Sequence, residues 1–111
     1  MRVSVVIPTY NRADYLKEAL CSVKAQTHSP FEIIVVDDGS TDQTETVVNN
    51  FDHEIRYLRR NHEGVAAARS AGVTAAQGDI LAWLDADDLW EPTFLKTVIQ
   101  RFVANPEIDG V

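Results

Sequence analysis

The sequence predicts an α/β fold, a three-layer α/β/α sandwich in which helices cover both faces of a mainly parallel sheet. Short β-branched runs with little polar alternation recur along the chain, as expected for strands that are buried on both faces. Stretches with apolar residues at helical spacing separate these runs. A strand–helix–strand order gives parallel strands joined by right-handed crossovers. The expected sheet is therefore Rossmann-like.

The first two strands are expected at Val3 to Ile7 and at Glu32 to Val36. Apolar residues at helical spacing predict a helix between them, with Asp14 in its first turn, where the helix dipole favours a negative charge. Cys21 is expected to pack within this helix. The buried face of the helix is expected to consist of Leu16, Ala19, Leu20 and Val23.

A second helix and a third strand follow. Ser40, with Gln43 three residues later, has the pattern of a capping box and predicts the start of the helix. The helix is expected to end near Asn50. The next β-branched and apolar run, Ile55 to Leu58, is the third expected strand.

The last part of the chain repeats the alternation. An Ala-rich helix is expected from Val65 to Gln77, and the fourth strand, Ile80 to Leu84, leads directly into an acidic segment. A final helix is expected to start near Pro92, a favoured first-turn residue. Its buried face is expected to consist of Phe94, Leu95, Val98, Ile99 and Phe102. Residues Ile108 to Val111 resemble the start of another strand, so we expect the natural chain to continue.

Length and composition limit the function. The chain has 111 residues, of which 45% are hydrophobic, and is expected to form one domain over residues 1–111. A single cysteine and the absence of a cleavable apolar leader favour a cytoplasmic location. The apolar runs are far shorter than the roughly 20 residues needed to cross a bilayer, so no membrane span is expected in this segment. A net charge of -7 argues against nucleic acid as a partner.

Three of the expected strands end in polar residues that parallel topology brings to one edge of the sheet, where such folds bind ligands. These segments are Pro8 to Asn11, Asp37 to Ser40 and Asp85 to Asp88. Two carboxylates at positions i and i+2, as in Asp85 and Asp87, suit Mg2+ or Mn2+ bound together with phosphate oxygens. The alternative is that these acids lie in solvated turns or cap helices.

Other residues near this edge have two interpretations each. Either Asp37 or Asp38 could accept the imide N–H of uracil while the other caps a helix or pairs locally, and we favour Asp38 as the base reader. Tyr10 offers a ring to a nucleobase or belongs to the core. Arg69 approaches a diphosphate or ribose, or forms an ordinary salt bridge.

Aromatic and histidine residues give weaker signals. Trp83 and Trp90 are expected to pack in the core, with sugar stacking by Trp90 as a lesser alternative. The histidines, which are His28, His53 and His62, have no metal-ligand spacing and are expected in loops or at the surface.

Four segments, in this order and at this spacing, resemble the inverting glycosyltransferases of family 2, which have the GT-A fold. The segments are Val3 to Asn11, Glu32 to Ser40, Gly64 to Gly72 and Gly78 to Asp88, and the resemblance covers essentially the whole chain. It implies that Pro8, Thr9 and Tyr10 flank the nucleoside and that Asp38 reads the base. It also implies that Asp85 and Asp87 form an Asp-x-Asp motif around a divalent metal, Mg2+ or Mn2+, bound to the diphosphate.

The resemblance further implies a reaction. A hexosyltransferase of this type moves a sugar from a nucleotide-diphosphate sugar, expected to be a UDP-sugar, to a saccharide, lipid-linked or protein acceptor with inversion, as in the biosynthesis of cell-surface polysaccharides. The catalytic base of relatives lies downstream, beyond Val111. The chain is therefore expected to be the nucleotide-sugar-binding half, inactive alone, in a protein that is cytoplasmic or at the inner face of the membrane.

Two alternatives remain open. A nucleotidyltransferase that makes nucleotide sugars would use a related sheet, but such enzymes usually carry a Gly-rich loop after the first strand. Residues Pro8 to Arg12 contain no glycine. A non-catalytic nucleotide-binding domain of the same fold is the other alternative.

Overall fold

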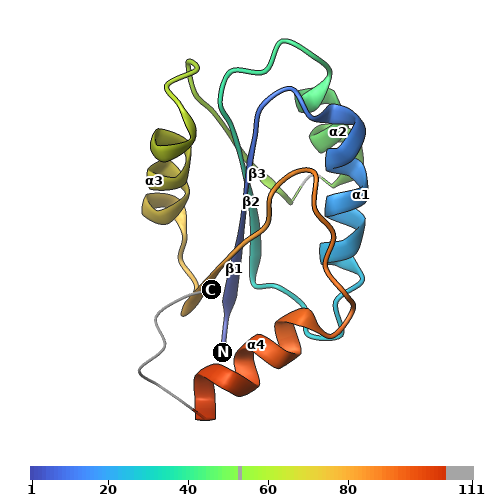
Figure 1. Ribbon diagram of the computed structural model, residues 1–111, viewed down its shortest axis with the longest axis vertical. Helices are drawn as coiled ribbons and strands as arrows, with labels where there is room; N and C mark the ends of the chain where they lie inside the picture. Colours follow the sequence, from blue (N-terminus) through green and yellow to red (C-terminus); the bar gives the residue numbers. More distant parts are fainter. Residues whose placement is uncertain (53, 105–111) are drawn as a thin grey trace.

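The computed structural model describes residues 1–52 and 54–104, in which strands and helices alternate throughout (Figure 1). In chain order the elements are β1 (Val3–Thr9), α1 (Ala13–Lys24), β2 (Glu32–Asp37), α2 (Thr44–Phe51), β3 (Arg56–Arg59), α3 (Val65–Ala75), β4 (Ile80–Trp83) and α4 (Phe94–Ala104). This order confirms the predicted α/β alternation. The strand expected at Ile108 to Val111 lies outside the described residues.

The sheet is parallel, with strand order β3-β2-β1-β4. Strand β1 pairs with β2 on one side and with β4 on the other, so Val5 lies opposite both Ile33 and Ala82. Each of its seven residues is buried. A strand with neighbours on both edges and helices on both faces has no solvent-facing side, which explains the unbroken apolar run of the sequence.

Helices lie on both faces of this sheet, with α3 on one side and α1 and α2 on the other (Figure 1). The larger core cluster joins Val5 of β1 to Leu20 of α1 and Leu95 of α4. The smaller cluster joins Val6 of β1 to Ala68 of α3. The predicted three-layer sandwich is therefore confirmed. No helix within residues 1–52 and 54–104 has the length and apolar character needed to span a membrane.

Helix α3 packs very closely on β1. Gly72, on the sheet-facing side of α3, has no side chain, and a Cβ atom added there would lie 2.4 Å from Cγ1 of Val6. Ala68, one turn earlier, is also buried. Small residues on this face bring the start of α3 within reach of the loops that follow β1 and β2.

The predicted capping box of Ser40 and Gln43 is wrong. Gln43 is at the N-cap position but makes no side-chain cap hydrogen bond, and α2 begins after it. The Ser40 hydroxyl oxygen instead accepts a hydrogen bond from the backbone N–H of Asn11, at 2.8 Å. A contact with another loop has replaced the local contact that the pattern predicted.

Asp42 caps both α1 and α2. One carboxylate oxygen accepts hydrogen bonds from the backbone N–H and the hydroxyl of Thr44, the first residue of α2. The other accepts from the backbone N–H of Ala13, the first residue of α1, at 3.1 Å. Burial raises the pKa of Asp42, but these hydrogen bonds outweigh it and lower the pKa below its ordinary value.

Other element boundaries differ modestly from the predictions. Strand β3 begins at Arg56, one residue later than expected, and α3 ends at Ala75, two residues early. Helix α4 begins at Phe94 instead of near Pro92, and the N–H of Leu95 donates to the side chain of Gln26.

The buried faces were predicted more closely than the boundaries. All four apolar residues expected on the inner face of α1 are buried, and Asp14 lies in its first turn. Cys21 is exposed, contrary to the expected packing, because its place on α1 is outside that apolar face. On α4, Leu95 and Val98 are buried, whereas three of the expected residues are only half-buried. These three are Phe94, Ile99 and Phe102.

Glu32, the first residue of β2, forms hydrogen bonds that connect several elements at the amino ends of the strands. Its carboxylate accepts hydrogen bonds from the Ser4 hydroxyl and the Gln77 backbone N–H, each at 2.6 Å, and from the Arg56 guanidinium at 3.1 Å. The bond to Gln77 lies just beyond the end of α3. Burial raises the pKa of Glu32, but the hydrogen bonds and the charge of Arg56 together lower it below the ordinary 4.5.

The close contact of α3 with β1 leads to a first prediction. Gly72→Ala should lower the free energy of unfolding by roughly 1–3 kcal/mol, because the added methyl group must displace Val6 or the helix. Urea unfolding measures this difference. Ser70→Ala, an exposed change on the same helix, serves as the control and should leave stability nearly unchanged. If Gly72→Ala and Ser70→Ala were equally stable, α3 would be able to move and accommodate the added methyl group, and the prediction would be wrong.

Glu32 leads to a second prediction, on pH. Its pKa is lower in the folded than in the unfolded chain, so its contribution to stability is complete above about 4.5 and is lost as the pH falls through the folded pKa. Glu32→Gln should lower the free energy of unfolding at neutral pH by about 1 kcal/mol. It should also make the free energy of unfolding less dependent on pH in the acid range. Unfolding followed from neutral to acid pH measures both effects. The exposed Glu18→Gln should change neither, and the same acid dependence in Glu32→Gln would refute the assignment.

Candidate functional site

A cavity of about 410 Å3 lies at the carboxyl ends of the strands, where parallel sheets bind ligands. It is formed by the loops that follow β1, β2, β3 and β4 and by the start of α3. Its lining residues are Pro8, Thr9, Tyr10, Arg12, Asp38, His62, Gly64, Val65, Ala68, Asp85, Ala86 and Asp87. Every residue predicted for the site except Arg69 is therefore brought together at this cavity.

The loop after β1 is fastened to the loop after β2. Asn11 has a left-handed backbone, with φ of +50°. Its side-chain oxygen accepts a hydrogen bond from the Thr41 backbone N–H at 2.8 Å, and its own N–H donates to Ser40. The backbone N–H of Asp38 also donates to the Thr9 carbonyl, at 2.9 Å. These bonds fix Tyr10 and Asp38 relative to each other.

Asp38 connects β2 to the loop that leads into α3. Only 6% of the residue is exposed. One carboxylate oxygen accepts from the backbone N–H of Glu63 at 2.8 Å, and the other from that of Gly64 at 3.1 Å. Each carboxylate oxygen has two lone-pair positions, so both can accept a further hydrogen bond from a ligand in the cavity.

Asp37 points away from the cavity and is fully buried. Its carboxylate accepts hydrogen bonds from the Ser40 backbone N–H at 2.9 Å and from the Tyr57 hydroxyl, and it lies 3.4 Å from the Arg59 guanidinium. Burial and, next, the bond to Asp37 raise the pKa of Tyr57 to about 12. Of the two roles considered for this aspartate pair, Asp37 thus has the local pairing role.

Asp85 and Asp87 reach the cavity from the turn that follows β4, in which the backbone N–H of Asp88 donates a hydrogen bond to the Asp85 carbonyl at 2.9 Å. Leu84 and Ala86 are 2% and 4% exposed and belong to the larger core cluster. The aspartates on either side of Ala86 are exposed, and both line the cavity. Among the described residues, neither carboxylate has a hydrogen-bond or ion-pair partner, so both are available to a ligand.

These two carboxylates suit a metal that brings other ligands with it. In the described part of the chain, no group of three or more His, Cys, Asp and Glu side chains could hold a metal ion. Mg2+ and Mn2+ commonly use one or two protein carboxylates, with substrate phosphates and water completing the coordination. The donor set fits a metal–diphosphate complex better than a metal held by protein alone.

The hydroxyl of Thr9 is buried beside the cavity. Thr9 is 5% exposed and lines the cavity, and its Oγ1 atom is buried without a hydrogen-bond partner among the described residues. A buried hydroxyl left unpaired is unfavourable. It is therefore suited to a polar atom of a bound molecule.

Tyr10 and His62 form a stacked pair at the cavity. Tyr10 is 40% exposed and does not belong to the core. Its ring centroid lies 4.3 Å from that of His62, with 28° between the planes. His62 is exposed, as the sequence predicted, but sequence reasoning missed its place in the site, as it did that of Arg12. His53 lies outside the described residues.

Arg69 does not line this cavity. Its guanidinium lies 5.5 Å from the ring centroid of Trp83, and no ion pair of Arg69 occurs within the described residues. Trp83 packs against the smaller core cluster, whereas Trp90 packs against the larger one and stacks on Phe94. Core packing is therefore the observed role of both tryptophans.

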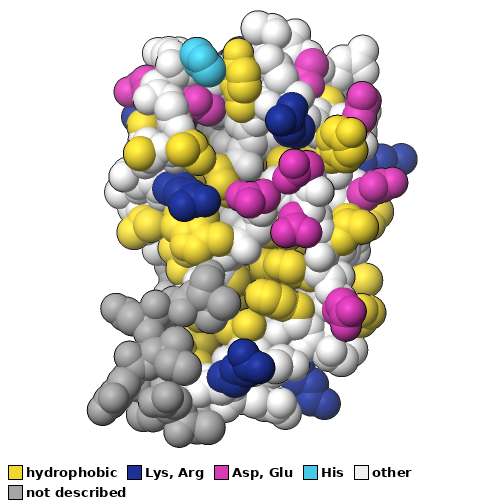
Figure 2. Space-filling model, viewed as in Figure 1, with side chains coloured by type: hydrophobic (Ala, Val, Ile, Leu, Met, Phe, Trp, Pro, Cys, Tyr) yellow, Lys and Arg dark blue, Asp and Glu magenta, His cyan; other side chains and the backbone are white. Residues whose placement is uncertain are grey.

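Acidic side chains gather at the centre of one face, near the loop that follows β4, with basic side chains beside them (Figure 2). The cavity itself is lined by three carboxylates and one arginine, in a protein with a net charge of -7. An anionic ligand would be repelled by this lining unless a cation accompanied it.

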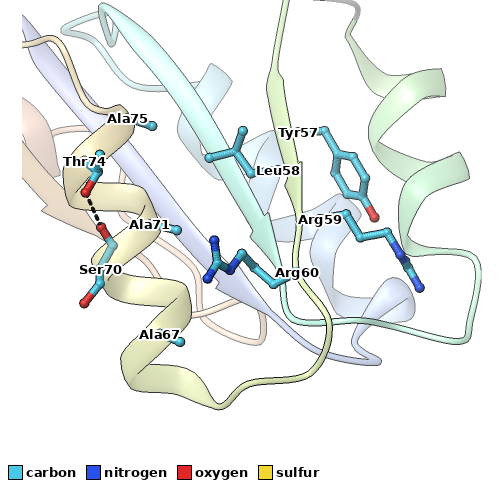
Figure 3. A pocket seen from close by; sticks show the side chains of 9 residues that line it. All are labelled: Tyr57, Leu58, Arg59, Arg60, Ala67, Ser70, Ala71, Thr74 and Ala75. Atoms are coloured by element: carbon cyan, nitrogen blue, oxygen red, sulfur yellow. Dashed lines mark hydrogen bonds between the residues drawn. The ribbon is translucent and has the colours of Figure 1, made fainter.

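A larger cavity, of about 670 Å3, lies between β3 and α3 (Figure 3). Arg60 extends into it from the β3 side, and small residues of α3, such as Ala67 and Ala71, form the opposite wall. No predicted site residue and no carboxylate lines it. We therefore place the candidate site at the smaller cavity.

Comparison with known proteins points to one family. A family model described as Glycosyl transferase family 2 matches residues 4–111. An uncharacterized glycosyltransferase of Nostoc sp. is 42% identical over 106 residues, covering 92% of this chain and 33% of the relative. Glycosyltransferase GlyA of Streptococcus pneumoniae is 34% identical over 105 residues, covering 92% of this chain and 15% of the relative. The chain thus spans a third or less of these relatives.

Solved structures agree. The mannosyltransferase PcManGT from Pyrobaculum calidifontis, in complex with GDP-Man and Mn2+, has a TM-score of 0.88 at 30% identity, over 96% of this chain and 33% of that one. S. aureus TarS in complex with UDP-GlcNAc has a TM-score of 0.84 at 30% identity, over 96% of this chain and 32% of that one. These likenesses confirm the predicted GT-A fold.

The contacts of Asp38 lead to a third prediction. Asp38→Ala removes the acceptor of two backbone N–H groups, so amide exchange at Glu63 and Gly64 should accelerate. The free energy of unfolding should fall by roughly 1–3 kcal/mol. Hydrogen exchange and urea unfolding measure these effects. Asp87→Ala, in the same cavity but without such bonds, is the control. Unchanged exchange in Asp38→Ala would contradict the anchoring role.

Proposed function

The chain belongs to glycosyl transferase family 2, and we propose that its cavity binds the nucleoside diphosphate sugar from which a family member transfers the sugar with inversion. The observation that supports this proposal most directly is the arrangement at the cavity. The carboxylates of Asp85 and Asp87, which have no partner in the described residues, lie at one cavity with Asp38 and the unpaired hydroxyl of Thr9. Such a set suits a ligand with an anionic part and a polar base.

We assign Asp85 and Asp87 to a divalent cation, Mn2+ or Mg2+, that binds together with the donor diphosphate. Two outward carboxylates separated by a buried alanine are a suitable donor set. When bound, the cation would neutralise charge on the leaving diphosphate. The presence of Mn2+ beside GDP-Man in PcManGT supports this assignment by analogy.

We assign the nucleoside to the other side of the cavity. Asp38 would accept a base N–H, Thr9 would hydrogen-bond a polar atom of the nucleoside, and Pro8 and Tyr10 would flank it. Uracil is the proposed base, in line with the UDP-GlcNAc complex of TarS. Since PcManGT was solved with a guanine nucleotide, the test below includes GDP.

Arg69 has a less direct role in the proposal. It is exposed on α3 and lies over Trp83 outside the cavity lining, so it would contact a diphosphate or ribose only after changing its position. We therefore assign nucleotide binding mainly to the residues that line the cavity.

In this proposal, sugar transfer also requires a catalytic base and an acceptor site, which these 111 residues do not provide. The chain spans about a third of the Nostoc relative. We place the catalytic base and the saccharide, lipid-linked or protein acceptor site beyond Val111, so these 111 residues would bind donor but transfer little sugar. A cytoplasmic location, in which the exposed thiol of Cys21 stays reduced, belongs to the same proposal.

The alternatives predict different binding. A nucleotidyltransferase needs a triphosphate cradle, but the loop after β1 has no glycine and is held by Asn11 to its neighbour. A non-catalytic domain would not need unpaired carboxylates in its cavity. The decisive difference is metal-dependent binding of a nucleoside diphosphate.

The fourth prediction tests this difference by calorimetric titration with UDP and with GDP, each with and without Mn2+. We expect UDP to bind in the presence of Mn2+, and the double variant Asp85→Ala, Asp87→Ala to lose roughly tenfold or more in affinity. The reason is that both cation ligands are removed while the fold is kept.

Asp88→Ala is the matched control, because it removes a like charge from the same loop but not from the cavity lining. It should bind nearly as the unchanged protein does. Preference for GDP would correct the base and keep the rest of the proposal. Absence of metal-dependent binding by the folded protein, or equal losses in Asp88→Ala and the double variant, would refute it.

A further inference from the structure

His62 has contacts with both halves of the proposed base site. Its ring stacks on Tyr10 at 4.3 Å between centroids. Its Nδ1 atom lies 3.2 Å from the backbone carbonyl oxygen of Asp38 and 3.4 Å from a carboxylate oxygen of the same residue. One imidazole thus contacts the aromatic residue and the acidic residue that the base would meet.

The loop holds His62 in this place at some cost. Its backbone is left-handed, with φ of +55°, which residues other than glycine adopt rarely. The two residues that follow it, Glu63 and Gly64, donate their N–H groups to Asp38. Strained backbone persists where surrounding contacts determine it, and such positions cluster at ligand sites.

We propose that Tyr10 and His62 form a two-ring stack that supports the nucleobase, with His62 as a positioning residue that sets the orientation of the Tyr10 ring. This inference rests on the proposed function and assigns a role within the same site. The ring pair is part of the cavity wall, and Asp38 lies directly beside it. A base stacked there would meet the ring face, while its edge would be within reach of the carboxylate.

The physical basis of the effect is ring stacking. Planar rings stack on nucleobases in a sequence-tolerant manner, and loss of one such contact weakens binding by about tenfold. A Tyr10 ring without its neighbour would be free to rotate about its side-chain bonds, because it is 40% exposed and outside the core. His62 would therefore increase affinity for the base without touching the diphosphate.

The fifth prediction uses two variants with opposite properties. His62→Asn favours the left-handed backbone but removes the ring, whereas His62→Phe keeps a ring but suits that backbone less well. Titrations with UDP and with pyrophosphate are made in the presence of Mn2+. We expect His62→Asn to weaken UDP binding by about tenfold and His62→Phe to stay close to the unchanged protein. Pyrophosphate, which has no base, should bind equally to all three.

Each other outcome has a clear meaning. Unchanged or tighter UDP binding by His62→Asn overturns the inference, because the imidazole would then be irrelevant or would cover the face that the base needs. Equal weakening of UDP and pyrophosphate also overturns it, since the residue would then only maintain the loop. If the unchanged protein binds pyrophosphate with Mn2+ but no nucleotide, the base site is refuted. If it binds neither, the proposed function itself fails.

Discussion

The pairing of β1 on both its edges is the constraint on which the rest of the structure depends. Because β2 and β4 both run parallel to β1, their carboxyl ends emerge on either side of it. Asp38 and Asp85, which are far apart in the sequence, therefore reach one cavity beside Tyr10. Complete burial of β1 is what fixes this arrangement, since a shift by one residue would bring Ser4 to positions that require apolar side chains.

The features of the fold that could be predicted from the sequence are those with a regular pattern of apolar residues. Strands β1 and β2 and the inner face of α1 were predictable because each buries many apolar side chains in a regular pattern. The shorter β3 and β4 were recognised from brief apolar runs, although no residue of β3 is fully buried. The start of α2 was not, since Asp42 rather than Ser40 provides the cap and does so for two helices at once. A capping pattern read locally carries no information about a competing partner from a distant loop, here Asn11.

The same distinction applies to the site. Asp85 and Asp87 were predictable because they directly follow a buried strand and alternate with core residues. His62 was not, because its position results from the path of a loop wrapped around Asp38, which has no periodic signature. Arg69 is the opposite case: its sequence neighbourhood suggested the site, but the helix directs its guanidinium over Trp83.

The hydrogen bonds between the loops give the two sides of the cavity different thermodynamic character. Asn11, Ser40 and Thr41 already hold the base side in one conformation before any ligand arrives. Much of the conformational entropy of this side has thus been lost during folding, so a base that docks there orders little additional chain. The side chains of Asp85 and Asp87 have no such restraint among the described residues. The entropic cost of assembling the complete site is therefore concentrated on its acidic side.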